Sequence, residues 1–274
     1  MAEPLQPTET VVIEITDPPK RKRRRWIGVL IGLVVLAILL VVGFFIADAY
    51  AKTYAEGYVR ERIIETLKLD PTAQVDVDLG TGSVLLQAVR GALDEVNVHV
   101  DTITFGEITG EAQIAATGVP LDSAQPLDTL DIRVTVDEDN VKKLSGNFSG
   151  IELTSIDLQN DLIRIGSEFK FLFITIPVAV DLNPTAKDGG INFDPVTILL
   201  GDDEISVADL RGNPQFSALA GDLLNSRDFC VASFLPQALT IEKVQIDGTD
   251  LIVDIDGDGT ALSDPALSTL GTCP

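Results

Sequence analysis

Hydrophobic and polar positions divide the chain into stretches with different periods. Residues 26–47 form an unbroken, uncharged run of 22 residues, WIGVLIGLVVLAILLVVGFFIA. At about 1.5 Å per residue such a run reaches roughly 33 Å as a helix, which matches the hydrocarbon core of a bilayer. The pattern therefore predicts a transmembrane helix at 26–47 and a membrane as its partner.

The two sides of this run differ in charge. Six consecutive bases, at 20–25, precede it, whereas Asp48 and a single nearby base, Lys52, follow it. By the positive-inside rule we expect a cytoplasmic N-terminus and an extracytoplasmic remainder. A cleaved signal peptide is the alternative, because Ala47-Asp48-Ala49 fits a small-x-small cleavage site. The run is longer than the usual apolar region of about 7–15 residues, which favours an uncleaved signal anchor.

The flanking segments have their own patterns. Residues 1–25 combine a Pro-, Glu- and Thr-rich stretch with the basic cluster, and we expect a disordered cytoplasmic tail. At 48–70 the apolar residues recur near helical spacing until Pro71, which predicts a juxtamembrane helix. Residues 71–274 remain as one extracytoplasmic domain, long enough for a packed core.

After Pro71 the period changes from helical to two. Apolar and polar residues alternate at 75–79, 96–100 and 130–136, which predicts half-buried strands. Strand follows strand without regular helices between them, so the predicted fold class is α+β with an antiparallel sheet. Further strands are expected at 103–108, 111–118, 151–158, 162–165, 168–182, 191–193, 196–200, 205–207, 239–246 and 250–256, and short helices at 83–92, after Asp137 or Asp139, and at 214–225.

The most apolar segment outside the membrane run is 168–182. Its odd positions are apolar up to Phe173 and its even positions from Leu172 onward, which predicts one long strand with a bulge or a strong twist. Pro177 favours an edge or bulge position. If this strand lines a groove for acyl chains, the candidate lipid-binding residues are Phe169, Phe171, Phe173, Ile174, Ile176 and Val178.

Charge and cysteine content narrow the function. Residues 1–47 hold six bases and four acids, which leaves 14 bases, 38 acids and a net charge of −24 in the rest. Such a domain repels nucleic acid, so no nucleic-acid partner is expected. Cys230 and Cys273 form an even pair in an exported domain, which predicts a disulfide. Two unpaired, buried thiols are the alternative.

Candidate catalytic and metal-binding residues are few. The single histidine, His99, lies among outward-facing strand residues, and no G-x-S-x-G, P-loop, H-E-x-x-H or paired C-x-x-C motif occurs. Residues 254–260 open like a calcium loop, but position 12 is Pro265 instead of Glu and no helix is expected before it. We therefore expect neither an enzyme nor a metal or cofactor site, and interpret 254–260 as a strand end with a Gly-rich turn.

Several short motifs follow one another in a familiar order. They are QVDVDLG at 74–80, SVLLQ at 83–87, VNVHV at 96–100, GVPL at 118–121, Asn183-Pro184, FDP at 193–195, Cys230 and FLP at 234–236. In this order, across nearly all of 50–274, the chain resembles the LmeA-like phospholipid-binding family of actinobacteria. The resemblance implies an elongated, twisted, tubular lipid-binding (TULIP-like) fold in the periplasm, which binds phospholipid and supports assembly of mannosylated envelope glycolipids. The long anchor departs from a typical secreted member and argues against free shuttling of lipid.

Two functions therefore compete. The first is a membrane-anchored cell-envelope protein that binds phospholipid or another acyl lipid, and the second is a structural or scaffolding protein of the envelope that binds no lipid. The acidic domain disfavours docking on anionic lipid by general attraction. Lipid recognition would then be apolar or would use local bases, namely Lys142, Lys143, Arg164 and Lys170. Since charged side chains are mostly exposed, solvated surface charge is the favoured interpretation of these four.

Overall fold

The computed structural model describes residues 23–67, 69–105, 108–143, 153–171, 174–201, 203–213 and 224–273. Most of the predicted tail and of the helix expected at 214–225 lie outside the described residues. The chain divides into two compact units, Met1–Ala47 and Asp48–Pro274. Each unit is described by itself below.

Helix α1 (Arg23–Leu67) includes the predicted membrane span at 26–47 and residues 48–67 of the juxtamembrane helix predicted at 48–70. In the first unit, Trp26 and the large apolar side chains between Val29 and Ile46 are exposed to the surroundings. The helix is long and apolar enough to cross a membrane. An exposed apolar helix of this length fits a single-pass membrane anchor.

In the second unit, the end of α1 is attached to strand β1 (Val75–Asp78). The Lys52 ammonium forms an ion pair with Asp78 at 2.9 Å, and the Arg60 guanidinium donates a hydrogen bond to the carbonyl oxygen of Val75. Ala55, Ile63 and Ile64 pack against the buried core of the domain. Polar and apolar contacts together therefore hold this part of the helix against the edge of the sheet.

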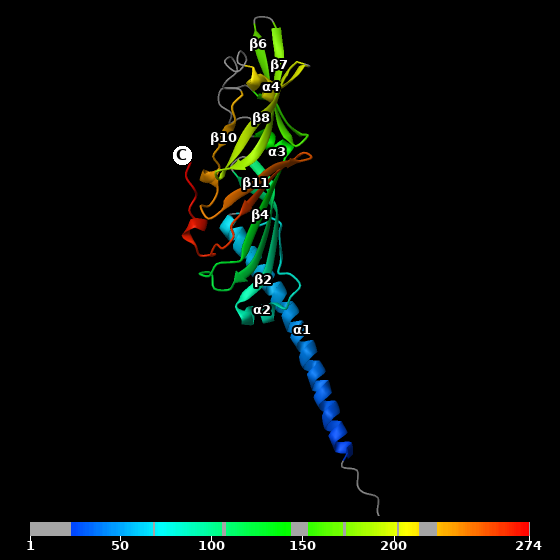
Figure 1. The fold of residues 1–274 in the computed structure, drawn as a ribbon. Helices are drawn as coiled ribbons and strands as arrows, with labels where there is room; N and C mark the ends of the chain where they lie inside the picture. Colours follow the sequence, from blue (N-terminus) through cyan, green and yellow to red (C-terminus); the bar gives the residue numbers. More distant parts are fainter. Residues whose placement is uncertain are drawn as a thin grey trace, which may run out of the picture. The chain divides into compact units, whose positions relative to one another are not determined.

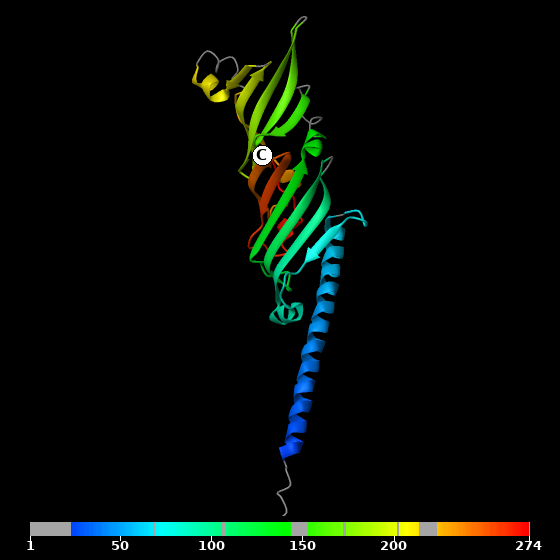
Figure 2. The same ribbon diagram turned by 90° about the vertical axis from the view of Figure 1, so that its right-hand side faces the viewer.

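Within the described residues, two antiparallel six-stranded sheets make up most of the second unit (Figures 1 and 2). The first sheet has the order β1-β2-β3-β4-β12-β11, and its further strands are β2 (Ala92–Phe105), β3 (Ile108–Pro120), β4 (Thr129–Asp137), β12 (Asp250–Asp256) and β11 (Thr240–Asp247). The second has the order β10-β8-β7-β6-β5, with β9 also paired to β8. Its strands are β10 (Arg227–Phe229), β8 (Gly190–Leu200), β7 (Ile174–Lys187), β6 (Leu162–Phe171), β5 (Leu153–Gln159) and β9 (Asp203–Ser206).

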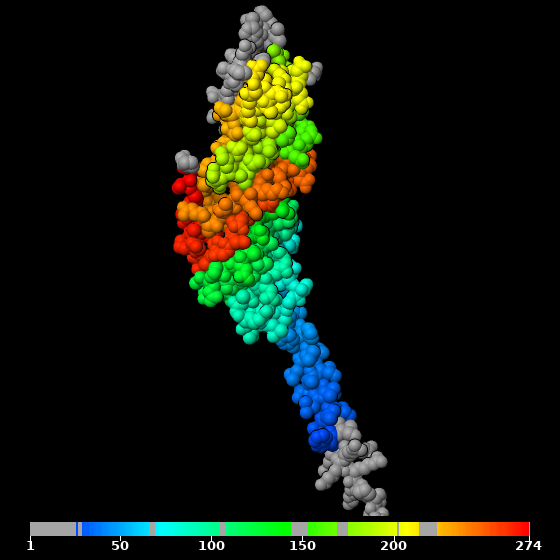
Figure 3. All heavy atoms as spheres, viewed as in Figure 1, coloured from blue at the N-terminus to red at the C-terminus, as the bar shows by residue number. Residues whose placement is uncertain are grey.

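Both sheets are open at their edges, so neither closes into a barrel. The predicted α+β class with antiparallel sheets is confirmed, and the architecture is consistent with a TULIP-like fold. The C-terminal strands lie beside strands far away in the sequence, since β12 pairs with β4 and Asp254 stands opposite Arg133 (Figure 3). The predicted strand at 96–100 and residues 103–105 of the strand predicted at 103–108 belong to one strand, β2, whose register shifts between Val100 and Ile103, whereas Ile108 begins β3.

Short helices begin and end at recognisable caps. Helix α2 (Val84–Arg90) begins after Ser83, whose hydroxyl accepts a hydrogen bond from the Leu86 N–H, and ends at Gly91 with φ 86°. The αL backbone at such a C-terminal position strongly favours glycine. Helix α3 (Glu138–Lys142) begins after Asp137, one of the two predicted caps. Helix α4 (Val207–Gly212) was not predicted, because six residues carry too little periodicity to be recognised.

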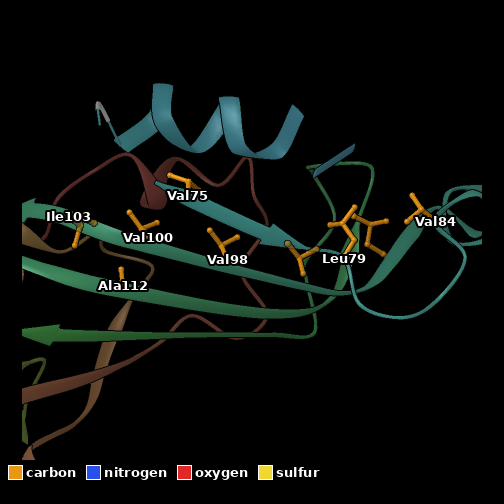
Figure 4. Close-up of a cluster of buried hydrophobic side chains, with 9 residues drawn as sticks. Val75, Leu79, Val84, Val98, Val100, Ile103 and Ala112 are labelled. Carbon is orange, nitrogen blue, oxygen red and sulfur yellow. The ribbon is translucent and has the colours of Figure 1, made fainter. Parts of the chain in front are cut away.

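The core lies on the apolar face of the first sheet and continues into the second. Val75, Val98 and Val100 are buried side by side beneath α1, as the alternating pattern predicted (Figure 4). A second cluster joins the sheets, because Val134 and Ile246 pack with Ile156, Leu158 and Ile163. The two sheets therefore share one hydrophobic layer.

The predicted disulfide is confirmed: Cys230 and Cys273 are joined with an S–S distance of 2.05 Å. Cys230 directly follows β10 of the second sheet, whereas Cys273 lies at the end of the segment that follows β12 of the first. Backbone hydrogen bonds continue the connection, from the Gly271 N–H to the Leu235 carbonyl and from the Gln237 N–H to the Thr269 carbonyl. The C-terminal segment is thereby attached to the body of the domain.

Candidate functional site

The apolar segment predicted as one strand at 168–182 is a pair of strands, β6 and β7. They pair antiparallel, with Phe171 opposite Ile174 and Phe169 opposite Ile176. Directly paired residues lie on the same face of the sheet. Because odd-numbered residues of β6 pair with even-numbered residues of β7, the apolar positions change from odd to even numbers where the chain reverses. The prediction of a single bulged strand at 168–182 was therefore wrong. Leu172-Phe173 carries none of the residues that normally mark a turn, which is why the reversal gave no signal.

The pairing assembles one apolar face on the second sheet. Starting from the side that meets the first sheet, successive rows across the strands bring together Leu158, Ile163 and Leu182; then Ile156, Ile165, Val180 and Ile198; then Val178 and Leu200; and then Phe169 and Ile176. Each row brings together aliphatic or aromatic residues of neighbouring strands, and in the third row the β6 residue, opposite Val178, is Ser167. The face therefore continues over β5, β6, β7 and β8.

Burial decreases along this face. Ile163 is 5% exposed and Ile198 is 8% exposed, whereas Ile176 is 39% and Leu200 is 43% exposed. The buried rows are covered by the first sheet and by a cluster that contains Val207 of α4 and Leu224. Beyond these covers, large aliphatic side chains of the same face meet solvent. We call Ile176 and Leu200 the open end of the second sheet.

The candidate lipid-binding residues fall into two groups. Val178 is half-buried and packs against the cluster around Ile198, and Ile176 is exposed. Phe169, Phe171 and Ile174 are placed by their backbone pairing, but their side chains, like Phe173 as a whole, lie outside the described residues. Leu200 was not among the candidates. Its position opposite Val178 depends on the register of β7 and β8, which no local pattern specifies.

Pro177 lies where the sequence indicated, at a position with a strand on one side only. It is paired with Glu168 of β6, and the pairing of β7 with β8 begins one residue later, at Val178. Its carbonyl oxygen accepts a hydrogen bond from the Gly201 N–H. Since proline has no N–H to donate, this end of the strand is a position that it tolerates.

Comparison with known proteins identifies the family of this chain. The family model described as LmeA-like phospholipid-binding matches residues 46–256. The chain belongs to this family. A search of the curated proteins and a search of the solved structures each returned no significant match. The family description supports lipid as the ligand of this LmeA-like protein and suggests a binding role rather than an enzymatic one.

Three of the four candidate bases are already engaged within the LmeA-like domain. Arg164 and Asp181 form a two-pronged ion pair, at 2.6 and 2.8 Å, which raises the pKa of the guanidinium. Lys142 contacts Glu138 at 2.6 Å and Lys143 donates to the Asn140 side chain, while the side chain of Lys170 lies outside the described residues. These contacts favour apolar recognition of a lipid over headgroup capture by these bases.

The polar face of the first sheet is hollowed. A volume of about 790 Å³ lies over it. One polar row crosses all six strands in register and lines this hollow: Asp76, His99, Gln113, Arg133, Asp254 and Lys243. Three of its charges are paired, as Arg133 contacts Asp254 at 2.7 Å and Asp76 contacts Arg60 of α1 at 3.6 Å. The hollow thus has charged and amide side chains in its lining, whereas the open end of the second sheet is aliphatic.

Residues 254–260, which resemble the opening of a calcium loop, make contacts that stabilise the first sheet. Asp254 is bound by Arg133, and an Asp258 carboxylate oxygen accepts a hydrogen bond from the Leu130 N–H at 2.7 Å. Gly257 closes the strand end, since its N–H donates to the Leu130 carbonyl. Among the described residues, no group of three or more His, Cys, Asp or Glu side chains could hold a metal ion.

Proposed function

We propose that this LmeA-like protein binds a phospholipid or another acyl lipid at the open end of the second sheet. The observation that carries the proposal is the exposure of Ile176 and Leu200 at the end of an otherwise buried apolar face. Covering apolar surface with an acyl chain instead of water is favourable by about 25 cal/mol per Å² of buried surface. Membership of a phospholipid-binding family supports a lipid as the occupant.

The proposed setting is the outer side of a membrane, with α1 as an uncleaved signal anchor and the N-terminus in the cytoplasm. Six bases on one side of the apolar run and a disulfide in the large domain support this orientation. A reporter fused after Pro274 should be active only outside the cytoplasm, and cytoplasmic activity would refute the orientation. A contribution to the assembly of mannosylated envelope glycolipids is the further role that the family resemblance suggests.

The lipid site can be tested with a phospholipid that carries a photoreactive group on its acyl chain. The full chain is reconstituted into vesicles containing this lipid, irradiated and digested, and the labelled peptides are identified by mass spectrometry. We expect label on peptides of β6, β7 and β8 in addition to the membrane span. Because the span contacts lipid in every variant, its label serves as an internal standard.

Two neighbouring substitutions separate the apolar face from its reverse. Ile176→Asp places a charge on the apolar face, where contact with an acyl chain would require its costly desolvation. Thr175→Asp is the matched control, because adjacent strand residues point to opposite faces. The ratio of label on β6, β7 and β8 to span label should fall several-fold in Ile176→Asp and stay near the parent value in Thr175→Asp. Label confined to the span in the parent would support the scaffolding alternative.

A further inference from the structure

Helix α2 presents two large apolar side chains to solvent. Leu86 is 55% and Val89 is 87% exposed, and residues three apart lie on one side of a helix. The opposite side is fixed to the sheet, because Val84 and Gln87 are buried and the Gln87 side-chain oxygen accepts a hydrogen bond from the Asp94 N–H at 2.8 Å. Leu86 and Val89 are thus exposed although the opposite side of the helix is firmly packed against the sheet.

A third exposed apolar residue lies beside the end of this helix. The Leu121 N–H donates to the Gly91 carbonyl at 2.9 Å, and the preceding residue, Pro120, pairs with Ala92. The Leu121 side chain is exposed as well. We call Leu86, Val89 and Leu121 the α2 tip.

The charge around α2 contrasts with that of the domain. Residues 79–93 contain no acid and one base, Arg90, although residues 48–274 carry a net charge of −24. Arg90 is paired with Asp94 at 2.9 Å. Helix α2 itself therefore carries no carboxylate, and the two carboxylates that contact it are engaged, Asp94 by Arg90 and Asp48 by Ser83 and the Leu85 N–H.

Hydrogen bonds connect α2 to the residue at which the chain leaves the membrane run. One carboxylate oxygen of Asp48 accepts from the Ser83 hydroxyl at 2.8 Å and from the Leu85 N–H at 2.9 Å. Asp48 directly follows Ala47, the last residue of the apolar run, and the exposed Tyr50 comes two residues later. Tyrosine is enriched at membrane–water interfaces. By covalent continuity alone, α2 is held within a few residues of that interface.

We propose that the α2 tip docks into the headgroup region of the membrane that holds α1. There Leu86, Val89 and Leu121 would exchange water for the boundary between headgroups and acyl chains, as amphipathic interfacial helices do. The docking is apolar, since the one base of the helix is already paired. It would provide the domain with a second attachment to the bilayer besides the span.

This docking is distinct from the proposed lipid site. Helix α2 and the β6–β7 strands lie at opposite ends of residues 48–274 (Figures 1 and 2). Loss of docking should therefore leave photolabelling of β6, β7 and β8 intact, and Ile176→Asp should leave docking intact. Failure of one proposal does not imply failure of the other.

The docking can be measured with a single tryptophan in the full chain. The protein has one tryptophan, Trp26, so Trp26→Phe gives a silent background. Val89→Trp then reports on the α2 tip, and Phe229→Trp reports on an exposed position of the second sheet. Both variants are reconstituted into phosphatidylcholine vesicles with or without brominated acyl chains, and fluorescence is also titrated with aqueous iodide.

We expect the Val89→Trp variant to have blue-shifted emission and to be quenched several-fold more strongly by brominated lipid than the Phe229→Trp variant. Aqueous iodide should quench the Phe229→Trp variant more strongly than the Val89→Trp variant. Adding Leu86→Asp to Val89→Trp should abolish most of the bromine quenching while the thermal unfolding transition is retained. Raising the salt concentration should leave the quenching unchanged. Equal quenching at positions 89 and 229, insensitivity to Leu86→Asp, or loss of quenching in high salt would each overturn the proposal.

Discussion

The two sheets show the same alternation of apolar and polar residues but bury it to different extents. In the first sheet, α1 and neighbouring segments cover the apolar face, so that Leu79 and Val100 are fully buried. In the second sheet the same kind of face continues past its covers to the exposed Ile176 and Leu200. Alternation therefore indicates which residues can be buried, whereas the neighbouring elements decide which of them remain accessible to a ligand.

The disulfide connects chain segments that continue from both sheets, so its removal should have the largest effect. Replacing Cys230 and Cys273 by serine should lower the free energy of unfolding by about 4 kcal/mol, because the bond closes a loop of 43 residues in the unfolded chain. Denaturant unfolding of the double variant measures this loss. Alkylation without reductant should modify neither cysteine in the parent, and free thiols at both positions would contradict the bond.

A pair of leucines tests the difference in burial directly. Leu79→Ala, at a fully buried position of the first cluster, should lower the free energy of unfolding by about 2–5 kcal/mol through lost contacts and a cavity. Leu200→Ala, at the open end, should cost only about 1 kcal/mol or less, because much of that side chain is already in water. Chemical denaturation of both variants gives the two values. Equal losses would mean that the second sheet is as well covered as the first.

Acid should produce the smallest of the three effects. The Leu85 N–H, followed by the Ser83 hydroxyl, lowers the pKa of Asp48; Lys52 lowers that of Asp78; and the Ser226 hydroxyl lowers that of Asp194. A carboxyl whose pKa is lower in the folded state stabilises the fold above its unfolded-state pKa, near about 4, and loses this contribution as the pH falls through the folded value.

The unfolding midpoint should therefore decrease as the pH is lowered from about 5 to 3. Asp48→Asn should flatten this dependence, because the amide no longer titrates, while at neutral pH it should weaken the attachment of α2. Denaturant midpoints across the pH series provide the measurement. A parent midpoint that rises on acidification would reverse the sign derived from these carboxyl groups.

Local signals in the sequence predicted much of this architecture. The caps at Ser83 and Asp137 marked two helices correctly, and strict alternation at 96–100 and 130–136 marked strands of the first sheet. Helix α4 and the three-residue strand β10 went unpredicted, since elements this short contain less than two periods of any pattern. The most consequential error was at 168–182, where a hairpin without turn residues resembled one continuous strand.

The sequence by itself determined the apolar run at 26–47, the acidic domain, the antiparallel fold class and the pairing of the two cysteines, because each depends on composition, local period or an even cysteine count. Only the tertiary structure decided where the apolar faces end. The register of β7 and β8 places Leu200 opposite Val178. The Asp48 carboxylate accepts a hydrogen bond from Ser83, which lies 35 positions further along the chain. Such contacts arise from long-range packing, which no window of neighbouring residues encodes. The two proposed contacts with lipid, at the open end of the second sheet and at the α2 tip, both depend on them.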